Sequence, residues 1–520
     1  MNRRQQTDSP PSWVPDTLHA LPQIFRYFLP ILLFGLLVVP LSAKVTNSVA
    51  SGIWSAPATW NNGVPADGDQ VTITGGHTVT LTANVNFTLA GSTLTVNGTL
   101  NLSTFTCQVL TTSVAAGGQV TQNTTSGLPV PANLTAVTLT LNTASTYAYT
   151  GNQTGFTGTH PMYGNVLYVS SAAGAGTLDV NLNIASNLTI NNSGAGEIRF
   201  GNTTNHSHTI GGNLILTAGN IAGSSGTANV ALDINGSFSI ANTATFKGCG
   251  ANGNLTVNLA GGFTQNGTLT SPGAGVFNLI FDGAANANIG GAAPLSLPTI
   301  TMNKTAGAIA TLTQHLTFTK SLTFLSGKIR LGNFNLTQAS GASASGASGA
   351  NGYAETTGTG KYILVMTTPG GNFPVGNGSY TPLSLVLTTL SSTFGVRVDS
   401  GFLAEIPGCT GYVTDDAVKK MWIIAREAGT ANISEMYVNW NGSDEGSSFN
   451  RALCSVARYL GGDWDTQVPN TATGSDPYQR GRVFGLASTV FEGTFGVIDN
   501  SASVNLTAPT GISNLSLIHI

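Results

Sequence analysis

The chain has 520 residues, of which only 8% are charged, against about a quarter in an average soluble protein, and its net charge at pH 7 is −3. No cluster of Lys or Arg follows the repeats, which excludes the electrostatic footprint of a nucleic-acid-binding protein. A hydrophobic fraction of 41% in regular strand patterns excludes a disordered chain.

The N-terminal segment has the pattern of a secretory signal. Arginines precede an apolar run over residues 28–39, and Pro40-Leu41-Ser42-Ala43 follows it. We expect a signal peptide over residues 1–43. A single anchoring helix is the alternative, but the run falls short of the ~20 residues that span a bilayer. The mature protein is therefore predicted to be secreted or at the cell surface, without a membrane span after cleavage.

Residues 44–70 are predicted to form an N-terminal cap. Trp54 and Trp60 stand six residues apart, ahead of the Pro65 turn, and no further Trp occurs until Trp422. Large aromatic residues at the entry to a repeat array suit a cap over the open first coil. The alternative is a stacking platform for sugar rings.

Residues 71–345 show an internal repeat. Short apolar-x-apolar strands recur with a spacing of 22 or 23 residues, at Leu188, Ile210, Leu232, Leu255, Phe277, Ile300 and Leu322. Apolar residues alternate with polar ones within each strand, and the segments are rich in Thr, Val, Asn and Gly instead of helix formers. A fixed period of this size predicts a solenoid. We expect an all-β chain with a right-handed parallel β-helix of about 22 residues per coil.

One insertion in this array, Thr146–Tyr163, is unusually aromatic. Two interpretations stay open: a loop that projects from the rod and contacts a ligand, or a cluster that packs over a coil. The candidate ligand contacts are Tyr147, Tyr149, Phe156 and Tyr163.

The composition changes after the Gly/Ala/Ser-rich run that ends at Gly352. We expect a linker over residues 346–352 and a C-terminal β-sandwich over residues 353–500, because several strands are separated there by Gly, Asn, Asp and Ser turns. Residues 501–520 are predicted to be a linker that leads to a truncated end. Of the four cysteines, Cys107 and Cys249 lie in the repeats, whereas Cys409 and Cys454 could pair or remain free thiols.

Motifs at both ends resemble a known group of proteins. The opening W-x-x-x-x-x-W, Gly68-Asp69-x-Val71-x-Ile73 and the segments Phe373-Pro374-Val375-Gly376 and Met421-Trp422-Ile423-Ile424 resemble secreted and cell-surface β-helix repeat proteins of Bacteroidota, and the opening also looks like a G8 domain. The resemblance implies an adhesin-like protein that is exported by the type IX secretion route.

No arrangement of acidic residues predicts a catalytic centre. The acids of the repeats occupy different positions in their coils; these are Asp179, Glu197, Asp233 and Asp282. Asp67 and Asp69 suit an Asx turn better than calcium, and His206 and His208 lack a third metal ligand. Acidic pairs flank the turns of the predicted sandwich at Asp415/Asp416, Asp444/Glu445 and Asp463/Asp465. We therefore predict no catalytic residue, no metal and no cofactor.

These observations favour a non-catalytic extracellular or cell-surface protein of structural or adhesin type, with extracellular glycans or cell-surface components as partners. The alternative is a carbohydrate-binding or polysaccharide-degrading β-helix, of lyase or hydrolase type. Outward threonines, as in Thr93-Leu94-Thr95 and Thr138-Leu139-Thr140, raise a more remote alternative, an ice-binding β-helix. Because the outward residues Thr189, Gly211, Asp233 and Thr256 do not form a uniform row, we expect no such surface.

Overall fold

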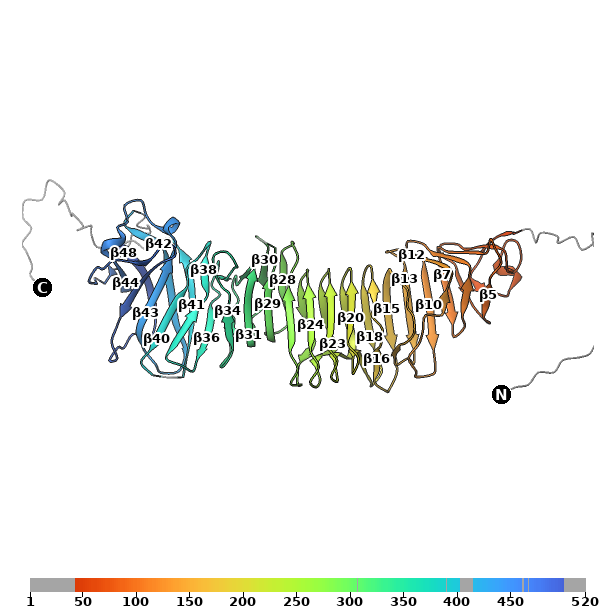
Figure 1. Cartoon of the computed structure of the whole chain (residues 1–520), viewed down its shortest axis with the longest axis horizontal. Helices are drawn as coiled ribbons and strands as arrows, with labels where there is room; N and C mark the ends of the chain where they lie inside the picture. Colours follow the sequence, from red (N-terminus) through yellow and green to blue (C-terminus); the bar gives the residue numbers. More distant parts are fainter. Residues whose placement is uncertain are drawn as a thin grey trace, which may run out of the picture.

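The computed structural model describes residues 43–305, 307–389, 391–402, 415–460, 463–465 and 467–499. The fold is all-β: a parallel solenoid of about 14 turns, with about 23 residues per turn, spans residues 45–376, and an antiparallel region follows it (Figure 1). At about 4.8 Å per stacked strand, the rod is about 60–65 Å long. The all-β class and the parallel β-helix are confirmed.

Of the two predicted terminal segments, 1–43 and 501–520, only residue 43 lies within the described residues. No helix in the part of the chain that the structure describes is long and apolar enough to cross a membrane.

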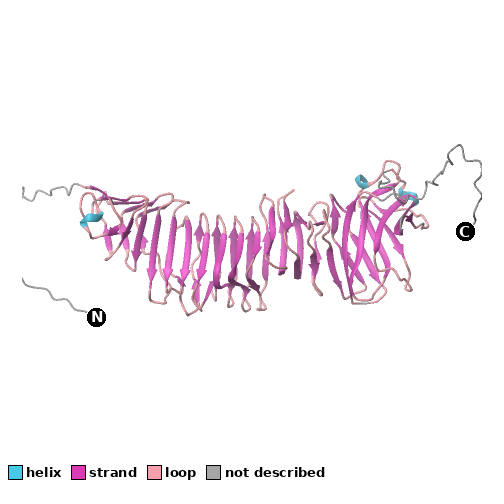
Figure 2. Cartoon of the chain, turned by 180° about the vertical axis from the view of Figure 1, so that it is seen from behind, coloured by secondary structure: helices cyan, strands magenta, loops and turns pink. Residues whose placement is uncertain are grey.

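The strands lie across the rod and stack side by side along it (Figure 2). Three sheets form the walls of the first half. The first sheet contains β1 (Val45–Asn47), β3 (Gln70–Ile73), β6 (Thr93–Val96), β9 (Thr111–Val114) and β12 (Thr138–Leu141). The short sheet contains β5 (Val85–Phe87), β8 (Cys107–Val109) and β11 (Leu134–Thr135).

The branched sheet runs along the whole rod. It contains β2 (Gly52–Ile53), β4 (Thr78–Thr80), β7 (Thr99–Ser103), β10 (Gln119–Thr124), β13 (Thr146–Gly151), β14 (Gly155–Phe156), β15 (Asn165–Ser170), β16 (Gly176–Leu178), β18 (Leu188–Asn192), β19 (Glu197–Gly201), β21 (Leu214–Ser224), β23 (Phe238–Cys249), β25 (Phe263–Gln265), β26 (Thr268–Thr270), β28 (Ala287–Gly291), β30 (Ile309–Leu312), β32 (Lys328–Arg330), β35 (Ala354–Glu355), β38 (Val375–Asn377) and β39 (Ser379–Tyr380).

The long sheet begins where the first and short sheets end, and it continues into the C-terminal region. Its solenoid strands are β17 (Asn183–Ile184), β20 (His206–Ile210), β22 (Val230–Ile234), β24 (Leu255–Leu259), β27 (Phe277–Phe281), β29 (Leu295–Asn303), β31 (Leu316–Ser326), β33 (Leu336–Gln338), β34 (Ser343–Ser345) and β36 (Tyr362–Met366). Its antiparallel strands are β41 (Ser392–Ser400), β42 (Ala417–Ala428), β48 (Gly493–Asp499), β44 (Cys454–Leu460) and β45 (Asp463–Trp464).

The outer sheet completes the sandwich. It contains β37 (Gly370–Phe373), β40 (Leu383–Leu387), β43 (Ile433–Trp440), β47 (Tyr478–Val483) and β46 (Thr473–Gly474). Three short 3-10 helices are η1 (Pro57–Thr59), η2 (Gly442–Asp444) and η3 (Arg451–Leu453). Buried residues between the outer and long sheets belong to a hydrophobic cluster that continues into the rod, and a smaller separate cluster contains Phe402, Met421 and Trp464. The predicted sandwich is therefore two antiparallel sheets that share the core of the solenoid.

The strand register shows that the repeat positions predicted from the sequence belong to two different sheets. Leu188 lies on β18 of the branched sheet, whereas Leu232 lies on β22 of the long sheet. Within the long sheet, Leu232 pairs with Val257, and Val257 pairs with Leu279, which gives steps of 25 and 22 residues. The mean period was predicted correctly, but loops of unequal length shift the phase between walls.

Asparagine side chains bridge successive turns. The Asn187 Oδ1 atom accepts a hydrogen bond from the Asn213 backbone N–H at 2.8 Å, and Asn213 Oδ1 accepts one from the Ser237 N–H at 2.7 Å. A second row does the same, with Asn205 accepting from Asn229 N and Asn254 accepting from Val276 N. Backbone donors at the turns are satisfied in this way. This requirement explains the high asparagine content.

The N-terminal turn closes the rod with its own chain. Asn61 donates its N–H to Asn47 O at 3.0 Å and accepts from Asn47 N–H through Oδ1 at 2.8 Å. The Asn62 side chain donates to Val45 O. These bonds occupy the outer edge of β1, which would otherwise be an open strand edge.

The predicted domain boundaries require correction. Parallel pairing begins within the predicted cap, where Val45 on β1 pairs with Gln70, and it continues past the predicted linker to the pair of Glu355 and Gly376. The segment 346–352 is a tight turn against the rod: a Cβ atom on Gly346 would lie 2.3 Å from Phe324 O. Glycine is needed there because the backbone below leaves no room for a side chain, and such a composition also resembles a linker.

Candidate functional site

The aromatic insertion lies inside the rod. Tyr147, Tyr149, Phe156 and Tyr163 are each at most 2% exposed, and the rings of Tyr147 and Tyr149 stack at 4.7 Å between centroids. A loop that projects to meet a ligand is therefore wrong, because these side chains fill the coil at the position where the first and short sheets end and the long sheet begins. Sequence periodicity could not show this change of cross-section.

A hydrogen-bond network accompanies these rings. Tyr147 OH donates to Gln122 Oε1 at 2.8 Å, and the Tyr149 and Tyr163 hydroxyls lie 2.5 Å apart. His160 Nδ1 lies 2.6 Å from Tyr163 OH, and His160 Nε2 lies 3.0 Å from Thr157 O. Burial lowers the pKa of His160 and raises the pKa of Tyr163. The network satisfies buried polar groups, as expected for a core.

The two N-terminal tryptophans are also buried. Trp54 and Trp60 are 5% and 3% exposed, with ring centroids 5.2 Å apart, and Trp60 Nε1 donates to Trp54 O at 2.7 Å. Trp54 also contacts the Phe87 ring. Both rings cover the interior at the N-terminal end of the rod, although parallel pairing already begins there at β1, and a sugar-stacking platform is wrong because both rings are buried.

Glu197 is held by three donors. It accepts hydrogen bonds from Arg199 Nε at 2.9 Å, Lys247 Nζ at 2.5 Å and Ser225 Oγ at 2.6 Å. Burial acts to raise the pKa of Glu197, but these bonds outweigh it and lower the pKa to about 2. A carboxylate in this state is a poor general acid near neutral pH.

Asp282 is an acid of the rod that is affected by the charge of a second acid, Asp233. Burial, and then the charge of Asp233, raises the pKa of Asp282, while Lys304 acts against that rise. Lys304 is buried, and its Nζ donates to the carbonyl oxygens of Ala260 and Asp282 at 3.1 and 2.5 Å. Since positions 260, 282 and 304 recur every 22 residues, the lysine caps a stack of turn carbonyls.

The candidate metal ligands have other partners. His206 Nε2 lies 2.9 Å from Asp179 Oδ1, and His208 Nε2 lies 3.0 Å from Phe200 O. Asp67 accepts from the Leu89 N–H and the Ser92 hydroxyl. Asp69 accepts from the Ala66 and Lys44 backbone N–H groups. Among the residues that the structure describes, no group of three His, Cys, Asp or Glu is placed to hold a metal ion.

The acids of the sandwich form structural contacts. Asp444 accepts from Ser379 Oγ at 2.8 Å and lies 3.5 Å from Lys420 Nζ. Glu445 pairs with Arg451, and Asp465 binds the two terminal nitrogens of Arg482. Asp415 accepts from Ser447 Oγ at 3.0 Å.

Three of the four cysteines lie in the part of the chain that the structure describes. Cys454 is a buried free thiol that donates to Arg451 O at 3.3 Å, and burial raises the pKa of this thiol to about 11. The structure therefore has the free-thiol alternative at Cys454, and Cys409 lies outside the described residues. Cys107 and Cys249 are buried free thiols.

The threonine rows are more regular than the sequence suggested. In the first sheet, Thr93, Thr111 and Thr138 pair in one column, and Thr72, Thr95, Ser113 and Thr140 pair in the next. The inward neighbours of the central strands, Leu94 and Thr112, are buried, so both columns face out. The residues tested in the sequence, Thr189 and Asp233, belong to different sheets, which is why the row was missed.

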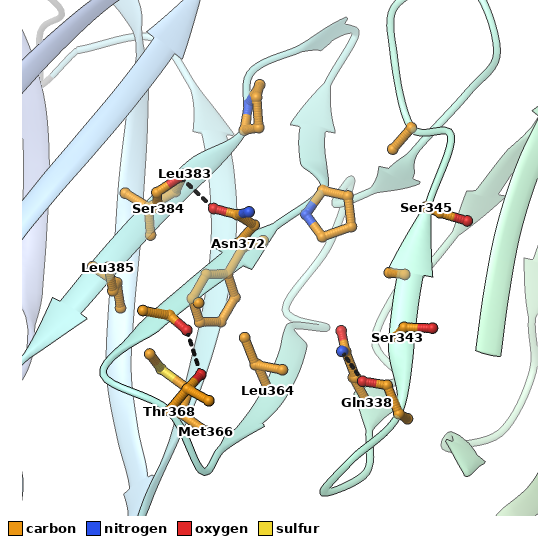
Figure 3. Close-up of a pocket in the computed structure, with 18 of the residues that line it drawn as sticks. Gln338, Ser343, Ser345, Leu364, Met366, Thr368, Asn372, Leu383, Ser384 and Leu385 are labelled. Atoms are coloured by element: carbon orange, nitrogen blue, oxygen red, sulfur yellow. Dashed lines mark hydrogen bonds between the residues drawn. The ribbon is translucent and has the colours of Figure 1, made fainter. Parts of the chain in front are cut away.

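A cleft of about 1020 Å³ opens where the rod meets the sandwich. In Figure 3, Ser343 and Ser345 of β34 lie on one side, Asn372 and Ser384 of the outer sheet lie on the other, and Leu364 lies between them. Ser384 Oγ donates to Asn372 Oδ1 at 2.7 Å. The described residues that line this cleft include no Asp, Glu, Lys or Arg. The sequence did not reveal the cleft, because it forms where the chain leaves the stack after β36 to form β37.

Comparisons with known proteins add no relative: no family model matches the chain, and no significant match was found among curated proteins or solved structures. The fold is that of a β-solenoid protein. The resemblance to Bacteroidota surface proteins stays a prediction from motifs.

Proposed function

We propose that the chain is a non-catalytic extracellular or cell-surface protein of adhesin or structural type, in which the solenoid is a rigid spacer and the sandwich carries the binding surface. The observation that carries this proposal is the continuity of the long sheet. β36 pairs in parallel with β33 of the rod and antiparallel with β41 of the sandwich. Main-chain hydrogen bonds therefore join the two parts, and the sandwich keeps a fixed direction at the end of the rod.

The charges of the chain support a binding role instead of a catalytic one. Glu197 and Glu355 are each held by two cationic side chains, and Asp465 by Arg482. The cleft at the junction has an uncharged lining of main chain, hydroxyl and amide groups. Such a surface suits recognition of a neutral ligand.

The proposal is tested by the orientation of the rod. Beads carry the protein tethered through its N-terminal or its C-terminal end, and their attachment is counted on surfaces coated with a neutral polysaccharide, an acidic polysaccharide or denatured albumin. We expect attachment to at least one coating only when the sandwich points outward. Equal attachment in both orientations, or turnover of uronic polysaccharides by the free protein, would contradict the proposal.

The outward columns of the first sheet favour a second candidate, an ordered-water or ice-binding surface. Hydroxyl groups there repeat along two directions, at the strand spacing of about 4.8 Å and at every second residue. The wild-type protein should then slow ice growth, and Thr95→Tyr should remove the effect. Thr256→Tyr, on the long sheet, is the matched control. Wild-type protein without any effect on ice growth removes this candidate.

A further inference from the structure

The edge of the outer sheet that faces the cleft has free main-chain groups. Gly370 on β37 pairs with Val386 on β40, and the Leu387 N–H donates to Pro369 O at 2.8 Å. In an antiparallel ladder this bond makes Gly370 and Val386 a non-hydrogen-bonded pair. The main-chain groups of Gly370, and two residues later those of Asn372, therefore point away from β40.

Among the described residues, a nearby threonine side chain is the partner of one of these main-chain groups. Gly370 O accepts from Thr368 Oγ1 at 3.0 Å, while the Gly370 and Asn372 N–H groups have no hydrogen-bond partner there. Both residues are exposed. β37 pairs with β40 alone, so its other edge is open.

The opposite wall of the cleft is a second open edge. β34 pairs with β31 and with no other described strand, although the equivalent strand β33 pairs on both sides. Its residues Ser343 and Ser345 are exposed, and their small side chains leave the main chain accessible. The next turn of the solenoid supplies no strand beside β34, because its chain diverges to form β37 of the outer sheet.

Short edges are common in β-proteins and by themselves attract no partner. What distinguishes this place is that two open edges line one cleft, which is neutral and has the nearly buried Leu364 between its walls. Of the two tyrosines in the lining, Tyr380 packs on Tyr353, whereas Tyr437 is partly exposed and its hydroxyl donates to Glu435. Main-chain donors flanked by glycine and serine suit another main chain.

We propose that the cleft binds an extended, uncharged polypeptide segment, which adds as a strand between β34 and β37 and bonds to both edges. This inference rests on the proposed function and names the ligand class of its binding module. Alternate side chains of the segment would face Leu364 and solvent, so a sequence that alternates apolar and hydroxyl residues fits best.

The first test removes one main-chain donor. The probe is the pentapeptide acetyl-Thr-Val-Thr-Val-Thr-amide with a fluorescent label, and its binding to the full chain is followed by fluorescence anisotropy. Gly370→Pro deletes the outward N–H, whereas Gly370→Ala keeps it and places its Cβ in open space. We expect Gly370→Pro to weaken binding about tenfold and Gly370→Ala to bind as wild type. Equal binding by both variants would overturn the proposal.

A second variant keeps the test decisive if the proline disturbs folding. Ser343→Lys places a charge on the other edge, and Ser207→Lys places the same charge on an exposed strand position far along the rod. Only Ser343→Lys should reduce binding. Peptides N-methylated either at both valines or at all three threonines should each fail to bind, because each loses the donors for one edge. If one methylated peptide binds normally, the segment does not bridge the two edges.

The outcomes separate this inference from the proposed function. Attachment of outward-facing sandwiches together with no peptide binding leaves the rod-and-module function standing and overturns the strand site. Displacement of the peptide by a neutral hexasaccharide but not by excess unlabelled peptide would assign the cleft to a glycan instead. Self-association of the wild type that Ser343→Lys abolishes, without peptide binding, would assign it to a second copy of the chain.

Discussion

The unpaired strand edges at the two ends of the solenoid are covered in different ways. At the N-terminal end the edge of β1 is covered by residues 59–62 of the same chain, and Trp54 and Trp60 close the interior. At the C-terminal end the long sheet continues into the sandwich, but β34 is left uncovered. The folded-back N-terminal segment covers the edge of β1, whereas at the other end the change from parallel to antiparallel pairing covers β36 and leaves β34 open.

Removal of the N-terminal closure should have the largest effect. Trp60→Ala leaves a cavity over the first turn and should lower the free energy of unfolding of that end by about 3–5 kcal/mol. Hydrogen exchange should show loss of protection in β1 and β3 before the rest of the rod. Trp60→Phe is the milder control. Unchanged protection in Trp60→Ala would mean that the edge bonds alone close this end.

The middle of the rod provides a reference for both ends. His208 is fully buried, and burial lowers its pKa to about 4 from an ordinary value of about 6.5. A lowered histidine pKa stabilises the fold above pH 6.5, and this contribution is lost as the pH falls towards 4, by about 3 kcal/mol. Denaturant unfolding between pH 7 and pH 4 should show that the free energy of unfolding falls with pH, and His208→Gln should reduce that fall. The control variant His315→Gln, at an exposed position, should leave it unchanged.

At the C-terminal end, Trp422 joins the long sheet to the segment that leads into the outer sheet. Its indole N–H donates to Thr381 O at 2.9 Å, and the side chain is fully buried. Trp422→Phe keeps most of the apolar volume but leaves the carbonyl without its donor, so we expect a loss of about 1–3 kcal/mol. Hydrogen exchange should locate the loss in β40 and β42. Loss at β1 instead would contradict independent closure of the two ends.

The smallest effect should come from the ion pairs beside the junction. Burial acts to raise the pKa of Glu355, but Lys328 and Arg330 outweigh it and lower the pKa. The carboxylate therefore stabilises the fold above its ordinary pKa of 4.5, and the contribution is lost as the pH falls below that value. Glu355→Gln should lower the free energy of unfolding by about 1 kcal/mol at pH 7 and by less at pH 3. Equal losses at both pH values would rule out an ionic origin.

Strand patterning made the solenoid predictable, because inward side chains such as Leu232 and Ile234 must alternate with outward ones. The strand register was not predictable, because the strands of several walls have the same apolar pattern and the loops between them differ in length. Composition misled in one place: Gly346 and Gly352 are glycines because neighbouring backbones leave no space, yet they resembled a linker. The cleft could not be predicted, because it arises where β37 leaves the stack, and no local pattern marks that departure.

The stacking of the strands also determines how the protein would behave under load. Pulling along the rod separates neighbouring turns, and each turn that is lost frees about 23 residues. At about 3.4 Å per extended residue, one turn of about 4.8 Å becomes a tether of almost 80 Å. Because the long sheet transmits tension from the sandwich directly into the rod, a bound particle would be held on a line that lengthens in steps, and the remaining turns would stay intact.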